Sequence, residues 1–314
     1  MQQTLAKKIL SIAGGIEITH SELIQPLWSN YGELLRVSLE GSKHTSVIVK
    51  HISLPNRDTH PRGWNTDLSQ QRKLKSYKVE TAWYQGFGQK TDTECKTPEF
   101  IGFSKKGNER ILVMEDLNTS GFPLRKQEVS IHEMQACLYW LAHFHSKFMG
   151  SQPTDLWEKG SYWHLDTRPD EWHTMSNVRL KNAAKTIDQE LSRATFQTII
   201  HGDAKLANFC FAEDGFKVAA VDFQYVGKGC GVKDVAYFLS SCLHEEALDA
   251  HAGKLLQYYF ESLQEGLDRY HQDFDKQALV EEWERLYPYA WADFYRFLDG
   301  WSPGHWKVHG YSKM

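Results

Sequence analysis

The sequence predicts an α+β fold in two lobes, a small strand-rich N-terminal lobe over residues 1–117 and a mostly helical C-terminal lobe over residues 118–314. Two observations predict this class. Apolar and polar residues alternate over short segments of the first third, and helical spacing replaces this alternation after a polar linker at residues 118–123. The length of 314 residues and the 41% of hydrophobic residues are sufficient for two cores.

Short alternating segments predict an antiparallel sheet in the first lobe. The four segments with this pattern are residues 33–39, 46–52, 99–104 and 110–115. A turn at Gly41 joins the first two as a hairpin, and a polar, proline-containing loop follows at residues 55–65. Residues 69–85 contain neither Gly nor Pro, so we expect a helix that ends at Gly86 or Gly88. Its basic residues are expected to form a solvated face: Arg72, Lys73, Lys75 and Lys78.

The second lobe begins with a strong helix signal. Ser130 and Glu133 form a capping box, and apolar residues at helical spacing follow as far as Gly150. After an irregular stretch at residues 151–174, the pattern predicts helices at residues 177–193, 233–243, 245–267 and 276–298, and strands at residues 198–200, 209–211 and 218–221. Pro288 predicts a break or kink in the last helix.

Charge and composition exclude several classes of protein. Lys and Arg number 36 against 40 Asp and Glu, a net charge of −4, which gives no support to nucleic-acid binding. Five cysteines without CxxC spacing argue against disulfides and structural zinc, so we expect a reducing, cytoplasmic location. No apolar run reaches the ~18 residues of a membrane span. Residues 9–16 allow a weak signal peptide, but Glu17 follows at once, which favours a first helix or strand of the fold.

One polar run carries the strongest chemical signal. His201, Asp203 and Asn208 form an H-x-D-x-x-x-x-N pattern, and Asp222 follows after a predicted hairpin. Phosphoryl transfer needs a carboxylate that orients a hydroxyl, and it needs oxygen ligands that hold Mg²⁺ on the phosphates. Because a strand precedes each acidic group, this arrangement predicts a site for phosphoryl transfer.

At these residues the chain resembles the aminoglycoside phosphotransferase and choline kinase superfamily, which shares the protein-kinase fold. The segments most similar to its ecdysteroid kinase-like branch are HGDAKLAN at residues 201–208, VDFQ at 221–224, KDVAYFL at 233–239 and LVMEDL at 112–117. The resemblance extends over about residues 32–243. It is weaker in the first lobe, where a full G-x-G-x-x-G loop is absent and only Gly41 lies between the first two strands.

The resemblance implies roles for individual residues around this loop. Asp203 would be the catalytic base, Asn208 and Asp222 would ligate Mg²⁺, and Lys205 would neutralise the transferring phosphate. The residues that would support the loop are His201, by hydrogen bonding, and Asp234, by anchoring the backbone. Direct transfer is typical of the superfamily, so a phosphohistidine intermediate is not expected.

The resemblance also implies an ATP site in the first lobe. Lys50, at the end of an apolar strand, would contact the nucleotide phosphates, and Glu80, on the following helix, would be its ion-pair partner. The hinge beside adenine would be formed by Met114, Glu115 and Leu117.

Aromatic residues near the C-terminal end are the candidates for an acceptor pocket. Trp291 and Trp301 with Asp293 would hold a cationic or flat acceptor through ring contacts and charge, although most aromatics at helical spacing are core. The resulting hypothesis is a kinase that transfers the γ-phosphate of Mg-ATP to a hydroxyl of a small acceptor, which is choline-like, aminoglycoside-like, a steroid or another alcohol. The alternative is a catalytically silent pseudokinase that binds nucleotide or a partner. A protein kinase is disfavoured, because the short segment between VDFQ and Asp234 leaves no room for an activation loop.

Overall fold

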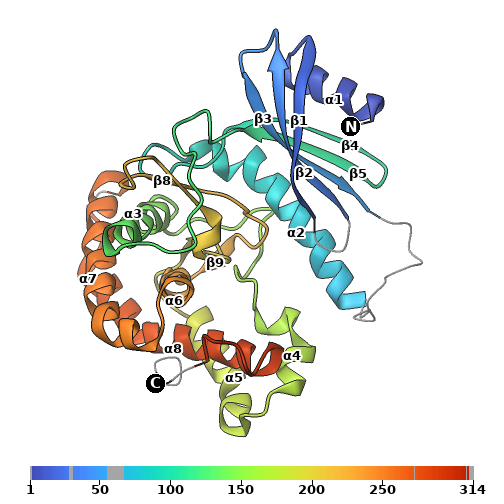
Figure 1. The fold of residues 1–314 in the computed structure, drawn as a ribbon. Helices are drawn as coiled ribbons and strands as arrows, with labels where there is room; N and C mark the ends of the chain where they lie inside the picture. Colours follow the sequence, from blue (N-terminus) through green and yellow to red (C-terminus); the bar gives the residue numbers. More distant parts are fainter. Residues whose placement is uncertain (1, 28–30, 55–66, 272, 309, 311–314) are drawn as a thin grey trace.

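The computed structural model describes residues 2–27, 31–54, 67–271, 273–308 and 310. Figure 1 shows a sheet with two helices joined to a larger, mostly helical part. This arrangement confirms the predicted α+β class, with an antiparallel sheet first and helices after it. The boundary at residue 117 stays a prediction, and the loop predicted at residues 55–65 lies outside the described residues.

The sheet has five antiparallel strands in the order β1-β2-β3-β5-β4. The strands are β1 (Glu17–Pro26), β2 (Gly32–Glu40), β3 (Ser46–Ser53), β4 (Phe100–Lys106) and β5 (Glu109–Glu115). Four of them match the predicted segments, and Gly41 has the left-handed φ of +71° in the predicted turn. The edge strand β1 has almost no buried side chains, which explains why its alternation is weak.

One helix covers each face of this sheet (Figure 1). α1 (Gln3–Ala13) packs on one face and α2 (Asp67–Gln85) lies on the other, where Trp83 is buried. Successive residues of β3 alternate between the faces, so Val47 and Val49 face α1 while Ile48 faces α2. Lys50 is two residues after Ile48, and it therefore faces α2.

The helical part is built on long apolar faces. Its helices are α3 (Ile131–Lys147), α4 (Pro169–Thr174), α5 (Val178–Ser192), α6 (Val232–Cys242), α7 (Glu245–Tyr270) and α8 (Lys276–Trp301). The capping box of Ser130 and Glu133 is present at the start of α3, as predicted. Pro288 lies inside α8 without ending it. Of the predicted break or kink, the break is therefore wrong, because buried side chains on both sides of Pro288 hold the two halves of the helix against the core. The kink stays a prediction.

Short strand pairs hold the polar loops between the two parts. β6 (Thr198–Ile200) pairs with β9 (Gly227–Gly229), and β7 (Phe209–Phe211) pairs with β8 (Val218–Ala220). β9, with the sequence GKG, has no apolar pattern and was not predicted. These ladders bring the loop after β6 next to the loop after β8.

Candidate active site

A buried ion pair connects the sheet to α2. Lys50 Nζ lies 2.8 and 2.7 Å from the two carboxylate oxygens of Glu80, and both side chains are buried. Lys50 Nζ also lies 3.5 Å from Asp222 Oδ1, which comes from the loop after β8. Burial alone lowers the pKa of Lys50, but the Glu80 and Asp222 carboxylates outweigh it and hold the pKa above its ordinary value. Lys50 therefore stays charged and joins the sheet, α2 and the second lobe.

The loop after β6 presents a carboxylate, an amide and an ammonium group. Asn208 Nδ2 donates to the backbone oxygen of Asp203 at 2.7 Å and to its Oδ2 at 3.1 Å. Lys205 Nζ lies 3.3 Å from the same Oδ2. Burial, and then the nearby Asp222 carboxylate, raise the pKa of Asp203, although Lys205 opposes this shift. Both Asn208 contacts use the amide nitrogen, which leaves its amide oxygen for another partner.

Buried hydrogen bonds fix the backbone of this loop. The Asp234 carboxylate accepts the backbone N–H of His201 at 2.6 Å and that of Gly202 at 2.9 Å, and it also contacts His145 Nε2 at 3.1 Å. His201 Nε2 lies 3.0 Å from the carbonyl of Val221 and so ties the two polar loops together. Gly202 has a φ of +75°, and a Cβ there would lie 2.2 Å from a backbone oxygen. Only glycine fits this position.

Asp222 is held in a strained backbone conformation. Its φ of +68° is uncommon for a residue with a Cβ. Phe223 stacks on Trp83 of α2 at 4.5 Å, and Gln224 Nε2 donates to Asp222 Oδ1 at 2.6 Å. Burial raises the pKa of Asp222, but Lys50, Lys73 and Lys205 outweigh it and lower the pKa below the ordinary value. The pKa values of Asp203 and Asp222 are thus displaced in opposite directions.

Two side chains that sequence reasoning did not select also join this cluster. Gln224 Oε1 accepts hydrogen bonds from Lys73 Nζ and from Ser76 Oγ of α2, each at 3.2 Å. Burial, and then the nearby Lys50, lower the pKa of Lys73 to about 8. The helical spacing of Lys73 from Glu80, seven residues, is the signal that places both on one face of α2.

The predicted solvated face of α2 is therefore only partly correct. Lys75 and Lys78 are exposed, as expected. Arg72 and Lys73 are half-buried because they turn towards the second lobe, where Arg72 donates to the carbonyl of Thr167.

The predicted hinge lies where β5 ends. Met114 and Leu117 are buried, and the Glu115 carboxylate contacts Lys96 Nζ at 2.6 Å. Between them, Asp116 accepts hydrogen bonds from Ser46 and Arg36 at 2.7 and 2.9 Å. These contacts fix the segment between the two parts of the chain.

The three residues predicted for the acceptor pocket lie on α8 in different environments. Asp293 and Trp291 are buried, whereas Trp301 is 44% exposed. The Asp293 carboxylate accepts hydrogen bonds from Arg296 at 2.7 and 2.9 Å and from Trp163 Nε1 at 2.9 Å, and it forms an ion pair with Lys233 Nζ at 3.2 Å. Both of its oxygens therefore have protein partners. Because two cations of the protein already neutralise Asp293, the structure favours a scaffolding role over contact with an acceptor.

Trp301 instead belongs to an aromatic row that ends at the Asp203 loop. It stacks on Phe297 at 5.5 Å, Phe297 contacts Tyr162 at 5.5 Å, and Tyr162 contacts Tyr225 at 5.2 Å. The backbone N–H of Tyr162 donates to the carbonyl of Gly202 at 2.8 Å. The row therefore reaches the loop, and the Arg168 guanidinium lies over its Tyr162 and Phe297 rings at 4.3 and 5.3 Å.

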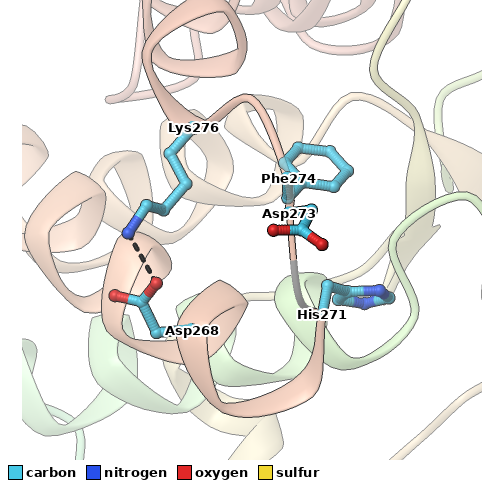
Figure 2. Close-up of a pocket in the computed structure, with 5 residues that line it drawn as sticks. All are labelled: Asp268, His271, Asp273, Phe274 and Lys276. Atoms are coloured by element: carbon cyan, nitrogen blue, oxygen red, sulfur yellow. Dashed lines mark hydrogen bonds and ion pairs between the residues drawn. The ribbon is translucent and has the colours of Figure 1, made fainter.

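Other parts of the described chain offer less chemistry. A cavity of about 430 Å³ at the turn between α7 and α8, shown in Figure 2, includes none of the residues above; it is lined by Asp268, His271, Asp273, Phe274 and Lys276. Among the described residues no group of three His, Cys, Asp or Glu side chains is placed to hold a metal, and all five cysteines are free. No described helix is long and apolar enough to cross a membrane.

Comparisons with solved structures return phosphotransferases at low identity. An aminoglycoside-3'-phosphotransferase of type VIII is 13% identical with a TM-score of 0.49, covering 91% of this chain and 100% of its own. An aminoglycoside phosphotransferase from Streptomyces rimosus, in complex with ADP and streptomycin, is 14% identical with a TM-score of 0.46, covering 91% and 99%. An ethanolamine kinase from Plasmodium vivax is 10% identical with a TM-score of 0.47, covering 100% and 93%.

No curated protein matches the chain. The family model of the ecdysteroid kinase-like family matches residues 160–272, a segment that contains Asp203, Asn208, Asp222 and Asp234. The resemblance inferred from the motifs is confirmed over this segment, so the chain is similar to the ecdysteroid kinase-like family in the part that carries its polar loops.

Proposed function

We propose that this protein is an ATP-dependent small-molecule kinase that transfers the γ-phosphate of ATP to a hydroxyl of a small acceptor. The observation that carries the proposal is the meeting of four charged side chains from distant segments. Lys50 and Glu80 of the first lobe lie against Asp222, and the Asp203 loop adjoins Asp222 from the second lobe. A phosphoryl-transfer site needs cations for the phosphates and carboxylates for the metal and the hydroxyl.

The opposite displacements of two carboxyl pKa values support separate roles. Asp222, whose pKa is lowered, stays ionised and suits metal binding, whereas Asp203, whose pKa is raised, suits proton transfer. In the proposed step the acceptor hydroxyl gives its proton to Asp203 as its oxygen bonds to the γ-phosphorus. The bond from that phosphorus to the β–γ bridging oxygen breaks, and ADP leaves. Lys50 and Lys205 neutralise phosphate charge.

The donor set fits Mg²⁺. Magnesium prefers oxygen ligands, and in phosphate sites it takes one or two from protein side chains and the rest from phosphates and water. The Asp222 carboxylate, with a side chain 36% exposed, and the Asn208 amide oxygen are such ligands, and a backbone hydrogen bond of 2.9 Å joins Asn208 to Val221. Bound Mg²⁺ would neutralise the negative charge of the phosphates.

We assign nucleotide binding to residues 1–117, with Met114, Glu115 and Leu117 beside adenine, and acceptor binding to residues 118–314. Tyr162, which is half-buried beside the Asp203 loop, is the proposed contact on the acceptor side. Trp301, which is exposed, is connected to it through the buried ring of Phe297. Asp234 and His201 hold the loop in place.

The test measures nucleotide binding and turnover separately. Thermal melting with and without Mg-ATP reports binding, because a ligand of the native state raises stability by RT ln(1 + [L]/Kd). ADP release is then screened against a library of hydroxyl metabolites, with Asp203→Asn as the matched inactive control. A melt unchanged by millimolar Mg-ATP would refute the nucleotide site. Binding without ADP release from any alcohol would favour the silent pseudokinase.

A further inference from the structure

One face of α2 is directed towards the loop that follows β8. It carries four residues spaced three or four positions apart: Lys73, Ser76, Glu80 and Trp83. Trp83 stacks on Phe223 of the loop at 4.5 Å. Glu80 binds the Lys50 ammonium. The remaining two residues of this face both contact Gln224, a side chain that has no role in the proposed phosphoryl transfer.

The Gln224 amide lies between these two residues and Asp222. Its Oε1 accepts hydrogen bonds from Lys73 Nζ and from Ser76 Oγ, each at 3.2 Å. Its Nε2 donates to Asp222 Oδ1 at 2.6 Å. Gln224 is 7% exposed, and Trp157 Nε1 donates to its backbone oxygen at 2.8 Å. The side chains of Lys73, Ser76, Gln224 and Asp222 are called the relay below.

The chemistry of the two ends of the relay requires an amide between them. The Lys73 ammonium has only donors and an ionised Asp222 carboxylate has only acceptors, so the group between them must accept at one end and donate at the other. A glutamate in place of Gln224 would put a second carboxylate against Asp222. Ser76 has a single hydroxyl proton and also lies 2.8 Å from the carbonyl of Lys73, so Lys73 is the main donor to the amide.

The relay also decides which oxygen of Asp222 stays free. Oδ1 contacts Gln224 Nε2 at 2.6 Å and Lys50 Nζ at 3.5 Å, whereas no hydrogen bond from a described residue reaches Oδ2. Without the amide, Asp222 can turn both oxygens onto the Lys50 ammonium, as Glu80 does at 2.7 and 2.8 Å. By holding Oδ1, Gln224 keeps Oδ2 available to a ligand.

We propose that Gln224 and Lys73 are positioning residues for metal binding: through the Gln224 amide, α2 orients the Asp222 carboxylate so that Oδ2 stays available to a metal ion. The inference rests on the proposed kinase function, in which Asp222 is a ligand of Mg²⁺. In this role neither Gln224 nor Lys73 touches the nucleotide or the acceptor. Replacing a side chain that orients a metal ligand changes metal affinity by ~10- to 100-fold.

The contact itself is tested without nucleotide. Denaturant titrations of wild type, Lys73→Met, Gln224→Met and the double variant form a double-mutant cycle. We expect the fold-loss of the folding equilibrium constant caused by Lys73→Met to be at least ~2-fold smaller in Gln224→Met protein than in wild type. Exposed Lys78→Met is the matched control, with the same cost in both backgrounds. Equal costs of Lys73→Met in the two backgrounds overturn the relay.

The positioning role is tested by titrating Mg²⁺ at a fixed ATP concentration and measuring Tm. Gln224→Met and Lys73→Met should raise the Mg²⁺ concentration that gives half of the maximal shift by ~10-fold or more. At saturating Mg²⁺ the ATP Kd of both variants should return close to that of wild type, because the Asp222 carboxylate is still present. Lys73→Arg keeps a donor and its charge, so it should keep the wild-type Mg²⁺ midpoint, as should Lys78→Met.

An unchanged Mg²⁺ midpoint in Gln224→Met overturns the positioning role. An ATP Kd that stays raised at saturating Mg²⁺ also overturns it, because direct contact of Lys73 with phosphate, or a packing defect, would have that effect. If Gln224→Met does not fold, Gln224→Asn, which is one methylene shorter, repeats both measurements. A wild-type protein without any Mg-ATP shift refutes the proposed kinase and with it the role in metal binding. A normal wild-type shift with additive costs in the cycle refutes the relay alone.

Discussion

Two clusters of an aspartate with basic side chains in this protein differ in how much of the carboxylate is exposed. In the helical part, Asp293 is 2% exposed in its side chain and is surrounded by Lys233, Arg296 and a Trp163 N–H. Between the lobes, Asp222 is 36% exposed in its side chain and has Lys50 at 3.5 Å. In the closed cluster both oxygens of the Asp293 carboxylate are already occupied by protein donors. The open cluster keeps carboxylate surface for a ligand, and this difference separates a structural ion network from a candidate catalytic one.

The largest expected effect comes from breaking the closed cluster. Asp293→Asn leaves two buried cations without their counter-charge, so we expect a loss of about 3–5 kcal/mol in the free energy of unfolding. The matched control is Asp268→Asn, which breaks an exposed pair with Lys276 and should cost under about 1 kcal/mol. Denaturant titration measures both. A stable Asp293→Asn protein with an altered acceptor KM would instead restore Asp293 to the acceptor site.

Substitution of the two carboxylates near the open cluster, Asp203 and Asp222, should affect kcat and nucleotide affinity differently. Asp203→Asn should lower kcat by ~10²-fold or more and spare ATP affinity, because its proton transfer occurs only in the transition state. Asp222→Asn should weaken Mg-nucleotide binding as well as turnover. Asn208→Ala should resemble Asp222→Asn and be partly relieved by excess Mg²⁺. Nucleotide titration together with kcat distinguishes them, and near wild-type turnover by Asp203→Asn would reject its assigned role.

A smaller effect is expected at Lys50. Lys50→Met removes the cation that Glu80 and Asp222 share, so most of the stabilisation by Mg-ATP should disappear. At ATP tenfold above its Kd, that stabilisation is about 1.4 kcal/mol. The measurement is the shift of Tm with ATP, and Lys75→Met, an exposed lysine on α2, is the control. An undiminished shift in Lys50→Met would place the nucleotide elsewhere.

The smallest expected change is in the pH dependence. Burial raises the pKa of Asp203, and a base must be ionised to accept a proton, so activity should fall on acidification at a higher pH than an ordinary aspartate would give. Lys205 lowers that pKa. Lys205→Met should therefore move the acidic limb of the kcat profile to still higher pH. A limb that moves to lower pH would contradict this electrostatic assignment.

Local patterns in the sequence were sufficient for most of the architecture. The alternation of residues 33–39 and 46–52 predicted β2 and β3, and the Ser130 capping box predicted the start of α3. β9 was missed because two of its three residues are glycine, so no apolar pattern marks it. α8 continues past Pro288 because packing outweighs the lost hydrogen bond.

The sequence by itself determined that Asp203, Asn208 and Asp222 fall at the ends of short apolar strands, because strand ends and polar spacing are local properties of the chain. Only the tertiary structure decided that Asp293 is neutralised, that Lys73 turns inwards, and that the Lys307 ammonium lies over the ring of Tyr237. The state of a charged side chain depends on the segments that remove water from it. Those segments are far apart in the sequence, as Lys307 and Tyr237 are, and no local pattern records that they meet.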